Sequence, residues 1–206
     1  MGIKSQDKRI GLQIEASQRI LGAIGPFIME FTRTELMLYK VLLRYVGVTD
    51  AVGRSIFDGV RADRMVDLLK AIIKNRGIGI RRAKDLEAIF PQFGSISTMR
   101  NFLVHQRIGG FSTTGTIVSS RERAKNLSAL SSHFVTYEML QAMTADLSQV
   151  ELRLTFHCRK GAFHPCPQGM RSPWLYKSPP TLDKPGKTHR AGQRRPVQHL
   201  SSRKRP

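Results

Sequence analysis

The chain has 206 residues with 40% hydrophobic content, which is enough for one domain with a core. Its formal net charge of +19 favours a polyanionic partner, most simply nucleic acid. Two cysteines are too few for a secreted disulfide framework, and no apolar run suits a leader peptide or a membrane span, so we expect a cytoplasmic protein outside the membrane.

The predicted elements begin with a weak helix or arm over residues 1–25, which three glycines interrupt. Pro26 suits the first turn of a stronger helix, in which apolar residues recur at helical spacing until Gly47. Two shorter helices are expected over residues 50–59 and 63–77, because each segment starts at an aspartate and ends at a glycine.

A fourth helical region is expected over residues 82–107, with a break or kink at Pro91 and Gly94. Residues 114–120 and 129–135 are then expected to pair as a small hairpin.

The last predicted helix begins at an N-cap, Thr136. Its apolar residues step by three and four positions, and they are Leu140, Met143, Leu147, Val150 and Leu154. The pattern as a whole predicts an all-α protein, an up-and-down helical bundle over residues 26–158 with a small β-hairpin excursion.

The composition changes after Cys158. Residues 159–206 contain 12 Lys or Arg, one acid and 8 of the 10 prolines. Such a segment buries too little apolar surface to offset its ordering entropy, so we expect a disordered basic tail over these residues.

Three polar side chains with catalytic potential lie in the fourth helical region. On a helix, Arg100, Asn101 and His105 share one arc, while Phe102 and Leu103 lie on the far side. The arc combines a fixed cation, an amide and a group that titrates near neutrality. Arg-x-x-x-x-His alone should occur about 0.6 times by chance in this composition, but Arg-Asn-x-x-x-His only about 0.01 times.

This pattern resembles the signature of the HEPN superfamily, whose name stands for higher eukaryotes and prokaryotes nucleotide-binding. The resemblance spans residues 27–157, and it includes residues 140–147, which are similar to a segment that often follows the motif. It implies a metal-independent endoribonuclease, often a toxin, that dimerises so that two motifs face one cleft. It nominates Arg100, Asn101 and His105 as catalytic residues.

RNA cleavage through the 2′-hydroxyl needs a base, an acid and positive charge at the phosphate, whereas a metal ion is optional. Two copies of His105 across a homodimer could divide the acid and base roles. Arg100 could hold the phosphate, and Asn101 could orient His105. We therefore expect RNA as partner and no cofactor or metal.

Other interpretations remain open. The motif could be an exposed helix face or a hydrogen-bonded pair between helices. The chain could also be a non-catalytic RNA- or nucleotide-binding module, or a structural partner in a toxin–antitoxin pair, with an antitoxin protein as a possible ligand. A zinc site needs better ligand spacing than the chain offers in His157, Cys158, His164 and Cys166.

Overall fold

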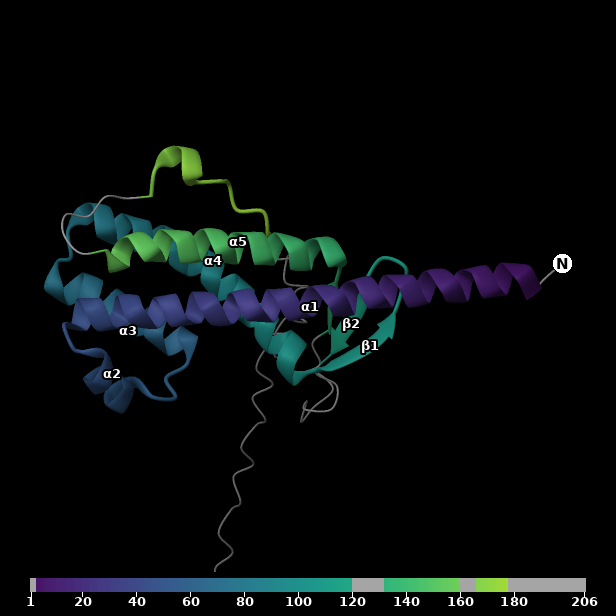
Figure 1. Cartoon of the computed structure of the whole chain (residues 1–206), viewed down its shortest axis with the longest axis horizontal. Coiled ribbons are helices and arrows are strands. Elements are labelled where there is room, and N and C mark those ends of the chain that lie inside the picture. Colours follow the sequence, from purple (N-terminus) through teal and green to yellow (C-terminus); the bar gives the residue numbers. More distant parts are fainter. Residues whose placement is uncertain (1–2, 120–131, 160–165, 178–206) are drawn as a thin grey trace, which may run out of the picture.

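The computed structural model describes residues 3–119, 132–159 and 166–177. Within them it is mostly helical with a small antiparallel sheet (Figure 1). The elements are α1 (Ile3–Val46), α2 (Asp50–Phe57), α3 (Ala62–Arg76), α4 (Ile80–His105), β1 (Arg107–Phe111), β2 (Thr116–Ser119), β3 (Ser132–Val135), α5 (Tyr137–Cys158) and a 3-10 helix (Gln168–Met170).

Helix α1 is continuous from Ile3 to Val46, which corrects the predicted boundary at Pro26. Buried apolar side chains, Ile20 and Phe27 among them, lie on both sides of the proline. A proline inside a helix costs about 3 kcal/mol, and each buried apolar side chain contributes about 1.5 to 3 kcal/mol. Packing therefore outweighs the local helix breakers, and the N-terminal part of α1 extends beyond the other elements (Figure 1).

The short helices α2 and α3 lie beside the C-terminal half of α1 (Figure 1). Both predicted helices are confirmed, but their N-caps are Thr49 for α2 and Arg61 for α3 rather than the aspartates expected to start them, Asp50 and Asp63. The Thr49 hydroxyl accepts a hydrogen bond from the Val52 N–H at 3.4 Å. Gly77 ends α3 with φ 62°, a left-handed conformation that glycine adopts without strain.

Helix α4 also runs without a break, so the break expected at Pro91 and Gly94 is wrong, while the alternative of a kink there stays a prediction. Its buried apolar face extends past both positions and stabilises the helix in the same way as in α1. The buried residues are Leu86, Ile89, Phe90, Phe93, Ile96, Met99 and Leu103. The Arg-Asn-x-x-x-His motif therefore occupies the last turns of a 26-residue helix.

The predicted hairpin is confirmed as the pairing of β2 with β3. Thr116 pairs with Val135 at one end and Ser119 with Ser132 at the other. The connection between these strands, residues 120–131, lies outside the described residues.

Strand β1 is a third member of the sheet that the sequence pattern did not predict. It follows α4 and pairs antiparallel with β2, with a shift in register between Ile108 and Phe111. Glycines fill the two positions between these residues, and glycine has low strand propensity, which explains why the strand was missed.

Helix α5 confirms the clearest sequence prediction. The Thr136 hydroxyl accepts a hydrogen bond from the Met139 N–H at 3.1 Å, as an N-cap does. All five predicted stripe residues are fully buried. Helix α5 lies along α1 (Figure 1), and the Thr34 hydroxyl of α1 donates to the Leu147 carbonyl at 3.3 Å.

Residues 166–177 pack against α4 and α5, which corrects the predicted start of a disordered tail after Cys158. The Asp146 carboxylate of α5 accepts the backbone N–H groups of Leu175 at 2.9 Å and Tyr176 at 2.8 Å. The Gln149 side chain exchanges two hydrogen bonds with the backbone of Ser172. We call residues 166–177 the strap. The side chains of Asp146 and Gln149 in α5 hold it in place, and the composition of the tail gives no sign of these partners. Residues 178–206 lie outside the described part.

The sequence contains no apolar run long enough for a membrane span, and the helices of the structure can be compared with that expectation. Among the described residues, every helix is too short or too polar to cross a lipid bilayer.

Candidate functional site

The candidate motif lies where α4 ends and the sheet begins. His105 is the last residue of α4, and its side chain is exposed. Gln106 caps the helix in an extended conformation, and its N–H donates to the Phe102 carbonyl at 3.0 Å. The chain then enters β1 directly, so His105 lies at a fixed junction between two regular elements.

Arg100 is positioned by α1. Its guanidinium carbon lies 5.2 Å from the centroid of the Phe31 ring, and Phe31 in turn stacks on Phe93 at 5.4 Å. This cation–π contact holds the half-buried cation against a rigid part of the core.

The Arg100 guanidinium makes few hydrogen bonds within the described protein. Arg100 Nη1 donates to Asn101 Oδ1 at 3.2 Å. Arg100 Nε is buried and has no hydrogen-bond partner among the described residues. Because Nε is closed off from solvent, the anion-binding capacity of Arg100 lies in its terminal guanidinium N–H groups, which suit the recognition of phosphates.

The structure brings Arg100 and Asn101 together but leaves His105 apart. Among the described residues, His105 forms no hydrogen bond with either of them. Asn101 therefore hydrogen-bonds to Arg100 in this structure, whereas the sequence analysis expected it to orient His105. The tautomer of the His105 imidazole is not fixed by a described neighbour.

A second histidine near the motif was not predicted. His133 of β3 packs on Phe102 of α4, with ring centroids 4.0 Å apart. Burial lowers the pKa of His133, because the charged imidazolium loses hydration. Burial therefore favours the neutral form of His133. Its place in a predicted strand gave no signal that it would lie beside the motif.

Sequence reasoning also missed a buried polar cluster at the other end of α4. The Asp85 carboxylate accepts Arg153 Nη2 at 2.7 Å and lies 2.9 Å from His157 Nε2. The Tyr45 hydroxyl lies 2.8 Å from His157 Nδ1. Arg171 of the strap reaches the same carboxylate at 3.3 Å.

The pKa of Asp85 and the burial of its partners indicate what this cluster does. Burial raises the pKa of Asp85, but hydrogen bonds from His157 and Arg153 lower it more, so the net pKa lies below its ordinary range. The side chains of Asp85, Arg153 and His157 are at most 7% exposed. The cluster joins α1, α4, α5 and the strap, and its burial makes it a structural link rather than a substrate site. Arg153 and His157 lie four residues apart on α5, a spacing that could have signalled the link.

The described residues hold no group of three potential metal-ligating side chains. The ring nitrogens of His157 face Tyr45 and Asp85, and both cysteines are free thiols. His164, the remaining residue considered for zinc, lies outside the described part.

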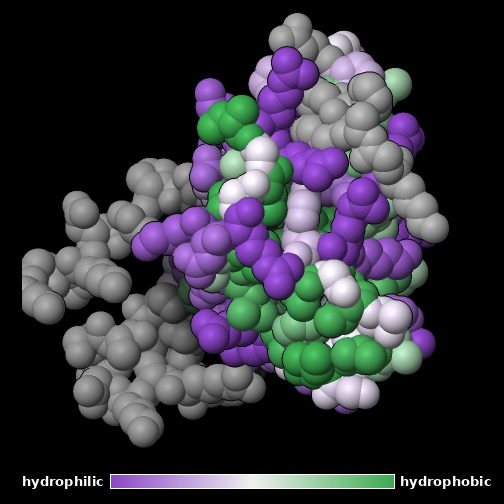
Figure 2. All heavy atoms as spheres, turned by 90° about the vertical axis from the view of Figure 1, so that its left-hand side faces the viewer, coloured by the Kyte–Doolittle hydropathy of each residue, from purple (hydrophilic) through white to green (hydrophobic). Residues whose placement is uncertain are grey.

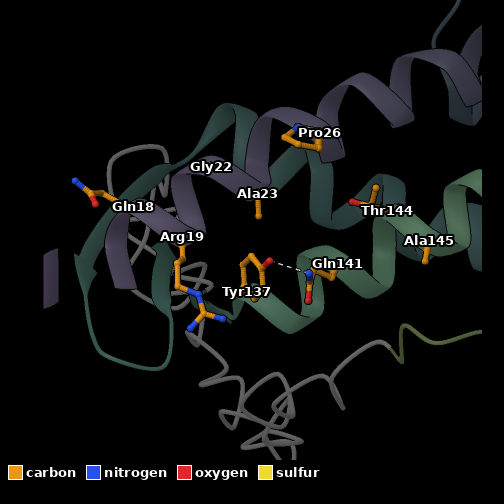
Figure 3. A pocket seen from close by; sticks show the side chains of 9 residues that line it. All are labelled: Gln18, Arg19, Gly22, Ala23, Pro26, Tyr137, Gln141, Thr144 and Ala145. Atoms are coloured by element: carbon orange, nitrogen blue, oxygen red, sulfur yellow. Dashed lines mark hydrogen bonds between the residues drawn. The ribbon is translucent and has the colours of Figure 1, made fainter. Parts of the chain in front are cut away.

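An open pocket lies elsewhere, between the N-terminal half of α1 and the start of α5 (Figure 3). It has a volume of about 550 Å³. Arg19 stacks over the Tyr137 ring at 4.6 Å, and Gln141 donates to the Tyr137 hydroxyl at 2.8 Å. The motif residues are not among its lining, which consists of Gln18, Arg19, Gly22, Ala23, Pro26, Tyr137, Gln141, Thr144 and Ala145.

No protein-family model, curated protein sequence or solved structure matches this chain.

Proposed function

We propose that this chain is a metal-independent endoribonuclease or RNA-targeting toxin of HEPN type, acting in the cytoplasm. The proposal includes an up-and-down, HEPN-like arrangement of its helices. The observation that carries it is the Arg100 guanidinium, which Phe31 holds in place and which hydrogen-bonds to Asn101. Exposed His105 lies little more than one turn further along the same helix.

The proposed chemistry assigns one task to each side chain. His105 exchanges protons with the 2′-hydroxyl or the leaving oxygen, because an imidazole nitrogen can both accept and donate a proton. Arg100 neutralises charge that develops on the phosphate. Asn101 fixes the plane of the guanidinium through its 3.2 Å hydrogen bond.

A homodimer would supply the second proton-transfer group. One His105 per chain serves as acid or base, and a two-fold axis adds the other. Exposed apolar side chains near this end of α4 support a protein interface. Val104 is 46% exposed, and the register partners Ile117 and Phe134 on the sheet are each 47% exposed.

The proposal is tested with the purified full chain, RNA and an excess of chelator. Attack by the 2′-hydroxyl leaves a 2′,3′-cyclic phosphate, so we expect fragments with that end and no dependence on divalent metal. Fragments that form only after a divalent metal is added would contradict the proposal.

A non-catalytic RNA-binding module is the second candidate. The observation that favours it is the absence of a described hydrogen-bond partner for His105 that would orient the imidazole. This candidate predicts salt-dependent RNA binding without fragments. A structural partner of a toxin–antitoxin pair would show neither binding nor cleavage.

A further inference from the structure

A concentrated basic surface lies at the turn between α3 and α4. Residues 70–84 contain six Lys or Arg and no acid. Five of these side chains are exposed, and Arg76 is the one of them that hydrogen-bonds within the described residues. We call the other four the α3–α4 corner: Lys70, Lys74, Arg81 and Lys84. The corner lies at the end of the molecule opposite the sheet (Figure 1), and Figure 2, which looks onto that end, shows hydrophilic side chains gathered there above an apolar patch.

The turn brings the two helix ends together. Gly77 and Gly79 have φ of 62° and 80°, conformations that a side chain would strain. They lie in the short turn between α3 and α4, two helices that contact each other, with Lys74 in the last turns of α3 and Arg81 in the first turn of α4. The other two cations of the segment are engaged differently: exposed Arg76 donates to the Tyr45 and Val46 carbonyls, and Arg82 is half-buried.

The corner residues have no partner among the described residues. Lys70, Lys74, Arg81 and Lys84 form no ion pair there. Other exposed cations of this chain do, such as Arg54, which lies 2.9 Å from Asp50. The charge of the corner is thus available to a ligand.

The placement of these cations works against helix stability. The first turn of α4 has no acid and its N-cap makes no side-chain hydrogen bond, whereas Arg81 lies in that turn. The helix dipole disfavours a cation there by about 0.3 to 1 kcal/mol. A residue that lowers helix stability and makes no compensating contact, as Arg81 does here, is more often kept for a function than for the fold.

We propose that the α3–α4 corner binds the sugar–phosphate backbone of RNA. This inference rests on the RNA partner of the proposed function but not on cleavage. Helix α4 has 26 residues, about 39 Å at 1.5 Å per residue, so the corner and His105 contact different parts of one RNA. The corner therefore anchors flanking RNA and contributes to affinity rather than to the chemical step.

Two variants of equal charge test the location of binding. The corner variant carries Lys70→Gln, Lys74→Gln, Arg81→Gln and Lys84→Gln. The control variant carries Arg33→Gln, Lys40→Gln, Arg54→Gln and Arg61→Gln, which removes four exposed cations from other parts of the surface.

Binding is measured by fluorescence anisotropy with a labelled single-stranded RNA long enough to span α4, over a range of salt concentrations. We use the full chain with His105→Ala so that no RNA is cut. The corner variant should bind about tenfold or more weakly than its parent. The slope of log K against log salt should fall in magnitude by about 3, because each phosphate contact contributes about 0.7. The control variant should retain most of the affinity and slope.

The outcomes separate the inference from the proposed function. If the parent binds RNA and both variants weaken binding equally, the corner has no special role and the inference is overturned, while the RNA partner stands. If the parent binds no RNA, both fail. Replacing the three corner lysines with arginine keeps the charge, so this variant should bind like the parent, and a loss in it would also contradict the inference.

Discussion

The His157 imidazole of α5 lies 2.9 Å from the Asp85 carboxylate of α4, and both side chains are almost completely buried. The same carboxylate accepts Arg153, so one acid holds two groups of the neighbouring helix. Buried charges of this kind are costly to separate, since removing one partner leaves the other without compensation.

Asp85→Asn should lower the free energy of unfolding by about 3 to 5 kcal/mol at pH 7, because Arg153 then lacks its counter-charge. Glu87→Gln, on the exposed side of the same helix, should change it by less than about 0.5 kcal/mol. Urea unfolding of both variants measures the difference. Equal stability of the two variants would show that the Asp85 cluster is not a structural link.

The stability from Asp85 should also depend on pH. Its pKa is lower in the folded protein than in the unfolded chain, so its contribution is present above the unfolded pKa of about 3.9. That contribution is lost as pH falls through the lower pKa of the folded state. The gap in urea midpoint between the natural chain and Asp85→Asn should therefore be large at pH 7 and shrink at about pH 3. A gap that stays constant would rule out this ionic contribution.

Two truncations test the strap. Removal of residues 178–206 should leave the melting temperature nearly unchanged, whereas removal of residues 160–206 should lower it by several degrees. The longer deletion takes two N–H donors from Asp146 and exposes the core that Tyr176 covers, a loss of about 3 kcal/mol or more. Equal melting temperatures for the two truncated proteins would contradict the packing of the strap.

Pro26→Ala separates the continuous α1 from a helix that starts at Pro26. Inside a helix, alanine restores a backbone hydrogen bond and removes a clash, so the variant should gain about 1 to 3 kcal/mol. At a first helical position, the change would bring little or no gain, because the proline N–H has no partner there in any case. Thermal unfolding with Gly25→Ala as a second α1 variant checks the result.

The sequence predicts this fold best where a local signal and the tertiary packing agree. Thr136 caps α5, and the apolar steps behind it become the buried face, so that helix was predicted throughout. The same reasoning placed breaks at Pro26 and Pro91, where burial on both sides outweighs the local preference. Helix periodicity could place Arg100 near Asn101, but the support from Phe31 depends on a contact between residues far apart in the chain.

The strap and the Asp85 cluster were missed for a related reason. Asp146 lies in the apolar stripe of α5, and its acceptors find their donors 29 and 30 residues later. Composition shows that residues 159–206 are basic and proline-rich. It cannot show that the Asp146 carboxylate of α5 accepts two of their backbone N–H groups.

The most direct test of the proposed RNA cleavage is a comparison of His105→Ala with His199→Ala, each incubated with RNA and chelator. Under the proposed function His105 is the proton-transfer residue of the motif, so its loss should slow cleavage about a hundredfold to ten-thousandfold while RNA affinity stays within about twofold. His199→Ala, outside the motif, should cleave like the natural chain. If His105→Ala cleaves RNA as fast as His199→Ala, the catalytic assignment is wrong.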